Sequence, residues 1–350
     1  MSVQTQAATQ PKDLDVQAIR AQFPILGETV HGRPFVFLDS AASAQKPVAV
    51  IDGMADVLRT QYANIHRGLY WMSDRATEAY EAVRGKVARF LNAPAREEII
   101  FTHNSTEAIN LVAHSFGTLL KPGQAVVISE MEHHANLIPW QILRDRAGIE
   151  LRVAPITDVG DLDMEALERL LSDGKVGLVA ITHMSNVLGS MVPARQVADM
   201  AHAAGALVLF DGSQAVVHQR TDVQALDADF YTFTGHKLYG PTGIGVLWAR
   251  AALLDAMPPF MGGGDMISTV TFANATWAAI PFKLDAGLPA IVAAIGLATA
   301  IVWVAPTRLD IISRPEQPVP PHALARLADL PAPPLAGAAG DRSAGRRGGK

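Results

Sequence analysis

The chain has 350 residues, of which 49% are hydrophobic, and it carries a formal net charge of −5 and no cysteine. This length and apolar content predict a large globular core, in one large domain with a smaller additional piece. The acidic balance argues against a nucleic-acid partner, and the missing thiols exclude disulfides, zinc–cysteine sites and thiol chemistry within this sequence.

The N-terminal third begins with a polar segment and then becomes helical. Residues 1–12 lack the apolar stretch of a secretory signal, so we expect a flexible N-terminus and a cytoplasmic protein. An amphipathic stretch at 15–23 and a short extended piece, PFVFLDS at 34–40, come before a helical region that includes 76–92. No apolar run reaches the roughly 18 to 20 residues that cross a bilayer, so we expect no membrane association.

From about Ile99 onward, short apolar runs alternate with amphipathic stretches. Runs of four to six Val, Ile and Leu, each followed by a helix-period stretch, predict β–α units and a mostly parallel sheet that is buried on both faces. The chain is therefore expected to be an α/β protein. The runs are EIIFTH at 98–103, AVVISE at 125–130, IELRVAPI at 149–156, VGLVAITHM at 176–184 and ALVLFDGSQ at 206–214.

The last part of the chain changes in kind. The run at 290–305, AIVAAIGLATAIVWVA, is too short to span a membrane and predicts a buried helix. Residues 305–350 are rich in Pro, Ala, Gly and Arg and show no helix or strand period, so we expect a disordered tail. The globular domain is accordingly expected over 13–304.

Ligands of doubly wound sheets bind beyond the carboxyl ends of the strands, so the polar residues there are the candidates for chemistry. Ser105 or Thr106 begins a helix, where free backbone N–H groups can bind an anion, although a plain helix cap would look the same. Asp211 ends a strand and could keep a ring nitrogen protonated, or it could serve as a turn residue. His133 and His134 are adjacent and have no partners at zinc-like spacing, so no metal site is expected.

Lys237 lies in TFTGHKLYGPTGIG, between an aromatic, β-branched run and two glycine turns. A partly desolvated lysine loses its proton more easily and can form a Schiff base with an aldehyde, but alone it would also fit a solvated surface group. An anion-binding helix start, a strand-end carboxylate, a stacking histidine and this amine together match what pyridoxal phosphate requires. The residue pattern therefore predicts a pyridoxal phosphate site.

Seven motifs occur in order along residues 13–304, and with them the sequence resembles the cysteine desulfurases of the class V aminotransferase fold, most closely the SufS-like branch that supplies sulfur for iron–sulfur cluster assembly. The resemblance implies a pyridoxal-phosphate-dependent transferase of fold type I, with a mostly parallel sheet flanked by helices, that forms a homodimer. The motifs are LDSAASAQKP (38–47), HRGLYWMSDRATE (66–78), STEAIN (105–110), MEHHANLIPWQ (131–141), THMSNVLG (182–189), DGSQAV (211–216) and TGHKLYGPTGIG (234–245).

The resemblance also implies roles for individual residues. Lys237 matches the Schiff-base lysine that moves the α-proton of the substrate, and Asp211 matches the partner of the pyridinium nitrogen. His133 matches the histidine stacked on the ring. The other implied contacts are Gln214 to the phenolic oxygen, Thr106, Thr234 and His236 to the phosphate, and Asn186 near the substrate carboxylate and a cofactor oxygen.

The implied reaction converts L-cysteine to L-alanine and passes the sulfur to a thiolate. In the family that thiolate comes from a cysteine in a C-terminal small domain, for which this sequence has no counterpart after about Val304. The tail has the composition of a GC-rich frame read out of register, which the gene sequence would test. Leu288 stands where the family commonly has a threonine that reaches the phosphate in the partner subunit, which implies weaker cofactor retention.

Three functions remain open at this point. The first is a cysteine desulfurase of this family that works with a sulfur-acceptor protein. The second is a cysteine or selenocysteine β-lyase of the same fold, which releases its chalcogen without an enzyme thiol. The third is a truncated remnant that binds the cofactor without turnover.

Overall fold

The computed structural model describes residues 15–305. The expected flexible N-terminus at 1–12 and, apart from Ala305, the expected disordered tail lie outside the described residues. The first described elements are α1 (Val16–Arg20), a short β1–β2 hairpin (Thr29–Val30 and Arg33–Pro34), α2 (Val48–Thr60) and α3 (Trp71–Leu91).

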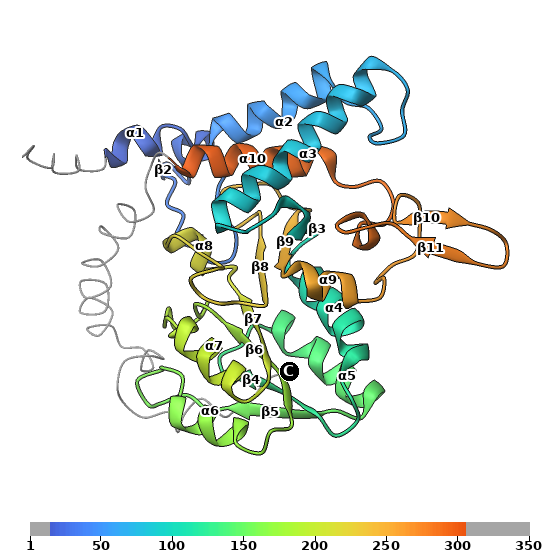
Figure 1. Ribbon diagram of the computed structural model, residues 1–350. Coiled ribbons are helices and arrows are strands. Elements are labelled where there is room, and N and C mark those ends of the chain that lie inside the picture. Colours follow the sequence, from blue (N-terminus) through green and yellow to red (C-terminus); the bar gives the residue numbers. More distant parts are fainter. Residues whose placement is uncertain (1–14, 306–350) are drawn as a thin grey trace, which may run out of the picture.

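A seven-stranded sheet forms the centre of the molecule (Figure 1), in the order β3–β9–β8–β7–β6–β4–β5. β9 pairs antiparallel with β3 and with β8. From β8 to β5, each strand runs parallel to the next in this order. The expected α/β fold with a mostly parallel sheet is therefore confirmed. The strands are β3 (Ile99–Thr102), β4 (Ala125–Ser129), β5 (Glu150–Ala154), β6 (Val176–Thr182), β7 (Leu207–Asp211), β8 (Phe230–Thr234) and β9 (Gly245–Ala249).

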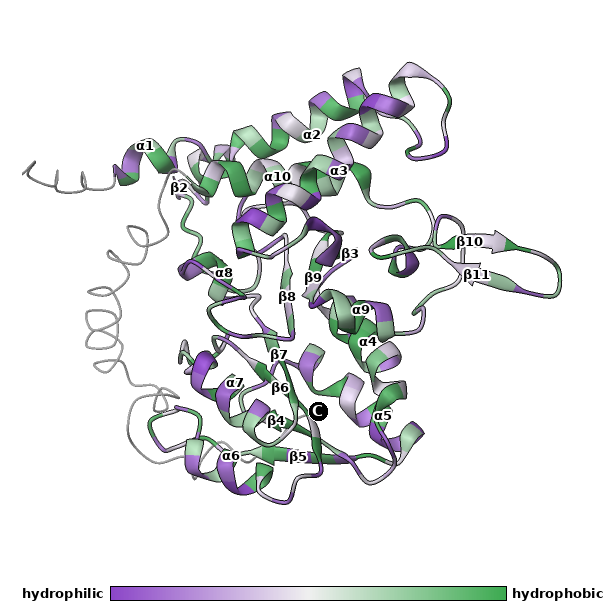
Figure 2. Cartoon of the chain, viewed as in Figure 1, coloured by the Kyte–Doolittle hydropathy of each residue, from purple (hydrophilic) through white to green (hydrophobic). Residues whose placement is uncertain are grey.

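Helices cover both faces of the sheet because successive strand residues point to opposite sides. In β4, for example, Val127 belongs to one apolar core and Val126 to the other. One core includes α3, α6 (Met164–Leu171), α7 (Ala194–Ala203) and α10 (Ile291–Val304), and the other includes α4 (Ser105–Ser115), α5 (Ile138–Ala147) and α9 (Ala251–Ala256). Figure 2 shows the central strands mostly green, as the uninterrupted apolar runs predict.

The run at 290–305 forms α10, which packs against α2 and α3 (Figure 1), so the expected buried helix is confirmed. Gly296 permits this close packing, because a Cβ atom there would lie 2.8 Å from the Met54 side chain. Within residues 15–305, no helix is both long enough and apolar enough to cross a membrane.

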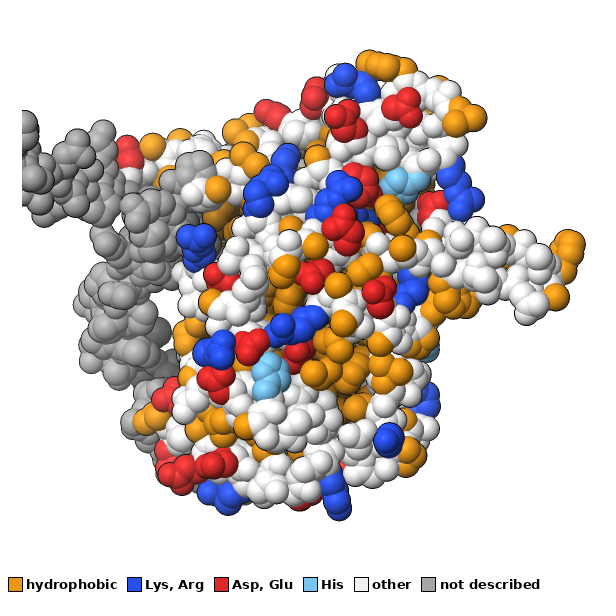
Figure 3. Space-filling model, viewed as in Figure 1, with side chains coloured by type: hydrophobic (Ala, Val, Ile, Leu, Met, Phe, Trp, Pro, Cys, Tyr) orange, Lys and Arg blue, Asp and Glu red, His pale blue; other side chains and the backbone are white. Residues whose placement is uncertain are grey.

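The expected extended piece at 34–40 forms no strand beyond Pro34, which pairs with Thr29. Val36 and Leu38 are exposed, and residues 35–40 run as irregular chain. A second hairpin, β10 (Ile267–Val270) with β11 (Ala275–Trp277), projects from the body (Figure 1). On the face shown in Figure 3, acidic and basic side chains are interspersed rather than gathered by sign.

Gly245, the first residue of β9, packs closely against the loop before α4. A Cβ atom there would lie 2.4 Å from the backbone carbonyl carbon of Asn104, which caps α4 by accepting a hydrogen bond from the Glu107 N–H. We expect Gly245→Ala to lower the free energy of unfolding by roughly 1–3 kcal/mol in urea titrations, because backbone must shift. Gly85→Ala is the control, since its Cβ would meet only Arg89 at 3.5 Å inside α3. Equal stability of the two variants would contradict this packing.

Candidate active site

A cavity of about 480 Å³ opens at the carboxyl ends of the parallel strands. Asp211 and Thr234 end β7 and β8, His133 and Asn186 follow β4 and β6, and Thr106 lies in the first turn of α4. Parallel strands bring these sequence-distant residues to one edge of the sheet. The lining residues are Asp39, Ala41, Ala42, Asn104, Ser105, Thr106, His133, Asn186, Asp211, Ser213, Thr234, His236 and Lys237, which include seven of the eight predicted site residues.

The start of α4 forms a wall of the cavity that suits an anion. Asn104 caps the helix, and Ser105 and Thr106 occupy its first two positions, where backbone N–H groups have no partner within the helix. The Ser105 hydroxyl lies 3.0 Å from the Ser213 hydroxyl and can donate to it, because the single Ser213 hydroxyl proton is directed to Asp211. These N–H groups and the helix dipole together favour a negatively charged group at this wall.

Thr234 presents an unpaired hydroxyl to the same cavity. Its side-chain oxygen is buried, yet within residues 15–305 it has no hydrogen-bond partner. An unpaired buried polar atom costs free energy, so it is retained where something else supplies the partner. The hydroxyl of Thr234 therefore fits a ligand with oxygen acceptors.

Asp211 is held rigidly at the end of β7. Only 6% of its surface is exposed, and its Oδ1 atom accepts hydrogen bonds from the Ser213 N–H at 3.0 Å and the Ser213 hydroxyl at 2.6 Å. Its backbone carbonyl accepts from the His183 N–H at 2.9 Å. The carboxylate is thus fixed in position at the cavity wall, where it can bind a cationic N–H group.

Lys237 lies in the turn after β8 and is half-buried. Burial lowers the pKa of its ammonium group, and the negative charge of Asp211 partly opposes this shift. A lower pKa raises the fraction of neutral amine near pH 7, and the neutral amine is the nucleophilic form.

His133 lines the cavity from the short turn that follows β4. Its Nδ1 atom accepts a hydrogen bond from the Ala135 N–H at 3.0 Å, so the proton of the neutral ring is on Nε2. Burial, and then the charge of Lys237, lower the pKa of the ring. An uncharged flat ring beside the amine is suited to stacking on an aromatic ligand.

Gln214 is the one predicted site residue that does not line the cavity. Its amide nitrogen donates to the carbonyl of Ala41 at 2.8 Å, and Ala41 is itself a lining residue. The contribution of Asp39, Ala41 and Ala42 to the cavity wall was not predicted from strand ends, because this segment precedes the sheet and forms no strand.

Glu132 is a further residue that the sequence reasoning missed. Its carboxyl accepts hydrogen bonds from the Ser129 hydroxyl, the Asn136 amide and the Thr182 N–H at 2.5, 2.6 and 2.9 Å. Burial raises its pKa to about 7 despite these donors. Glu132 precedes His133 in MEHHAN, just after β4 ends. This position is the one sequence signal that could have pointed to Glu132 as a buried carboxyl.

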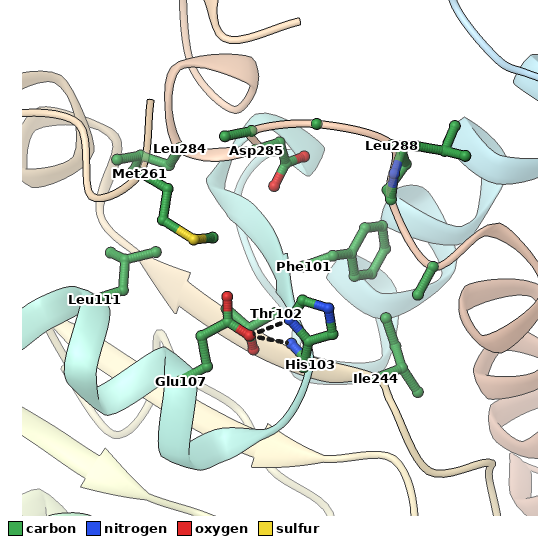
Figure 4. Close-up of a pocket in the computed structure, with 14 residues that line it drawn as sticks. Phe101, Thr102, His103, Glu107, Leu111, Ile244, Met261, Leu284, Asp285 and Leu288 are labelled. Carbon is green, nitrogen blue, oxygen red and sulfur yellow. Dashed lines mark hydrogen bonds and ion pairs between the residues drawn. The ribbon is translucent and has the colours of Figure 1, made fainter. Parts of the chain in front are cut away.

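A second, smaller cavity of about 60 Å³ lies beside β3 and α4 (Figure 4). His103 Nδ1 lies at hydrogen-bond distance, 2.5 Å, from Glu107 Oε2 at its wall, and Asp285 approaches from the opposite side. Leu288, where the resemblance implied a threonine, lines this cavity rather than the cavity of Lys237. Over the described part of the chain, no group of three His, Asp or Glu side chains is placed to hold a metal ion.

Comparison with known proteins identifies the family. The family model described as aminotransferase class V matches residues 36–346, which extends past Val304 into residues outside the described range. A cysteine desulfurase of Dickeya dadantii is 52% identical over 318 residues, covering 90% of this chain and 77% of the relative, and one of Serratia proteamaculans is 50% identical, covering 90% and 78%.

Solved structures agree with this assignment. The cysteine desulfurase CsdA from Escherichia coli superposes with a TM-score of 0.83 at 38% identity, covering 91% of this chain and 79% of that chain. An apo cysteine desulfurase from Thermococcus onnurineus gives a TM-score of 0.85 at 34% identity, covering 91% and 78%. The chain therefore belongs to the aminotransferase class V family and, within it, to the cysteine desulfurases.

Proposed function

We propose that this chain is a pyridoxal-phosphate-dependent enzyme that removes sulfur from L-cysteine and leaves L-alanine. The observation that carries the proposal is the single cavity of about 480 Å³, in which the amine of Lys237, the fixed carboxylate of Asp211 and the first turn of α4 converge. This combination suits a ligand with an aldehyde, a basic ring nitrogen and a phosphate.

The lining residues fit the cofactor group by group. Thr106 at the helix start, the unpaired hydroxyl of Thr234 and His236 would hold the phosphate, and Asp211 would pair with the ring nitrogen. His133 would cover the ring face, and Lys237 would bind the aldehyde carbon. Asn186 would contact the substrate carboxylate. Gln214, which does not line the cavity but donates to the carbonyl of Ala41, is proposed to contact the phenolic oxygen.

When bound, pyridoxal phosphate supplies an electron sink that makes the α-proton of an attached amino acid acidic. Asp211 would keep the ring nitrogen protonated, because a neighbouring anion favours the charged form of a base. Lys237, with a pKa lowered by burial, would remove the α-proton of cysteine and return a proton to the product. His133 would restrict the ring to one orientation and exclude water from that face.

The sulfur must finally leave to an acceptor. The 350 residues contain no cysteine, so we propose that an external thiol or a sulfur-acceptor protein takes it, in the cytoplasm and in the service of iron–sulfur cluster assembly. A homodimer is part of the proposal. The same observation supports a second candidate, a cysteine or selenocysteine β-lyase that releases its chalcogen without an enzyme thiol. The chalcogen leaves at the zero oxidation level, and an external dithiol such as dithiothreitol supplies the two electrons that convert it to sulfide or selenide while being oxidised to its disulfide.

The test is to load the purified full chain with pyridoxal phosphate, add L-cysteine with dithiothreitol, and measure L-alanine and sulfide. Alanine formation that rises with dithiothreitol concentration is expected for sulfur transfer to an external thiol. Alanine with L-selenocysteine but not with L-cysteine would favour the β-lyase. Cofactor binding without alanine from either substrate would contradict both, and would correspond to a remnant that only binds the cofactor.

Leu288 provides a separate test of the proposed dimer. If this residue approaches the phosphate bound by the partner subunit, Leu288→Thr restores a hydrogen-bond donor and should tighten cofactor retention by on the order of 1 kcal/mol, or about fivefold. The measurement is the dissociation constant for pyridoxal phosphate, determined by equilibrium dialysis. Leu119→Thr, which changes another exposed leucine, is the control. Unchanged affinity in Leu288→Thr would argue against this contact.

A further inference from the structure

A segment that precedes the sheet forms one wall of the Lys237 cavity. Residues 39–46, which we call the strap, contribute Asp39, Ala41 and Ala42 to the lining. Much of the strap is exposed, and residues 39–46 belong to no helix or strand. Its position therefore depends on individual side-chain and backbone contacts with the rest of the chain.

The strap is attached mainly to one residue, His236, which immediately precedes Lys237. The carbonyl oxygen of His236 accepts hydrogen bonds from the Ala44 N–H at 3.1 Å and from the Lys46 ammonium group at 2.9 Å. The His236 ring also contacts the Ser43 hydroxyl through Nδ1 at 3.1 Å. Three contacts from the strap thus converge on a residue about 190 positions away in sequence.

Lys46 is an unusual lysine for such a location. Its ammonium group is half-buried and donates to two backbone carbonyls, those of Ala44 and His236. No carboxylate within residues 15–305 offsets its burial, which lowers the pKa of its ammonium group to about 8. Burying an ammonium group without a counter-charge is unfavourable. We therefore expect that Lys46 is retained because its hydrogen bonds serve the site.

The carbonyl that Lys46 holds is part of the peptide group joining His236 to Lys237. On its other side the turn is fixed by its own backbone bonds, in which the carbonyl of Gly235 accepts from the Leu238 and Gly240 N–H groups at 3.0 Å. The orientation of the His236–Lys237 peptide decides the direction in which the Lys237 side chain leaves the backbone. Lys46 is consequently placed to set the approach of the Lys237 amine to the cavity.

We propose that Lys46 is a positioning residue for Lys237, which it orients by holding the His236 carbonyl. This inference rests on the proposed use of Lys237 to bind the cofactor aldehyde. A reacting amine must be held close to the productive geometry, and a small displacement reduces the rate strongly. Loss of Lys46 should therefore slow the attachment of pyridoxal phosphate to Lys237 without altering Lys237 itself.

The experiment compares the wild-type chain with Lys46→Met, Lys46→Arg and the control Lys121→Met, whose lysine is exposed in a loop away from the cavity. The rate at which the absorption band of lysine-linked pyridoxal phosphate appears is measured by stopped flow. We expect Lys46→Met to be slower by about tenfold or more, and Lys46→Arg to recover most of the rate because it still donates to carbonyls. Lys121→Met should match the wild type.

A second readout needs no cofactor. Hydrogen–deuterium exchange of peptides covering 38–47 and 234–245 should become faster in Lys46→Met, while the core strands stay protected. Should Lys46→Met fail to fold, as judged by thermal melting, Lys46→Ala, which also lacks a donor, takes its place.

The outcomes separate this inference from the proposed function. A wild-type chain that forms no lysine-linked band overturns the proposed function. A band that forms as fast in Lys46→Met as in the wild type, with unchanged exchange in both peptides, overturns the role of Lys46 alone. The same holds if Lys46→Arg is as slow as Lys46→Met, because holding the carbonyl requires only a donor.

Discussion

Lys237→Ala is expected to abolish the visible absorption band of lysine-linked pyridoxal phosphate and to reduce alanine formation from L-cysteine by at least about 10³-fold. The methyl group of alanine can neither bond to the aldehyde nor carry the α-proton. Both the absorption band and the rate should be lost, because two functions of one amine disappear together. The measurements are the spectrum after desalting and the rate of alanine release at saturating L-cysteine.

Two controls give this prediction its specificity. Lys175→Ala removes an exposed lysine and should leave the spectrum and the rate unchanged. Lys237→Arg keeps a positive charge but forms no such bond with the aldehyde, so it should lose the lysine-linked band as well. If the band persisted in Lys237→Ala, the bonding amine would belong to another lysine, and the assignment of Lys237 would be wrong.

The strands and most of the candidate cavity could be predicted because each is marked by residues that are adjacent in sequence. A buried parallel strand appears as an uninterrupted apolar run, and the residue that follows it lies at the carboxyl edge of the sheet. This reasoning located Asp211, His133 and Lys237 before any contact was known, and all three line one cavity. The resemblance to the family extended the set to Asn186, Thr234 and His236 at the same edge.

What the sequence did not reveal depends on contacts between distant residues. The strap reaches His236 through Lys46, and nothing in the local pattern of LDSAASAQKP indicates a partner so far along the chain. The extended appearance of 34–40 likewise predicted a regular piece, but residues 35–40 pair with none of the strands. The hydrogen bond that ties Gln214 to Ala41 belongs to the same class of contact.

Asp211→Asn is expected to lower the rate of alanine formation by about 10² to 10⁴-fold while the lysine-linked absorption band still forms. An amide carries no negative charge, so it cannot keep the ring nitrogen of the cofactor protonated, and the electron sink is weakened. The fold should survive, because the amide oxygen can still accept the two hydrogen bonds that Ser213 donates to Oδ1. Asp211→Asn should therefore keep the absorption band and lose the rate, whereas Lys237→Ala should lose both.

Ser213→Ala is the matched control for this separation. It removes the hydroxyl that donates to Asp211 at 2.6 Å but leaves the carboxylate, its charge and the second bond from the Ser213 N–H in place. A loss of one hydrogen bond to a charged group predicts a decrease of about tenfold, well short of that for Asp211→Asn. If Asp211→Asn lost no more activity than Ser213→Ala, the negative charge of Asp211 would be dispensable, and its part in the reaction would be limited to orienting the ring.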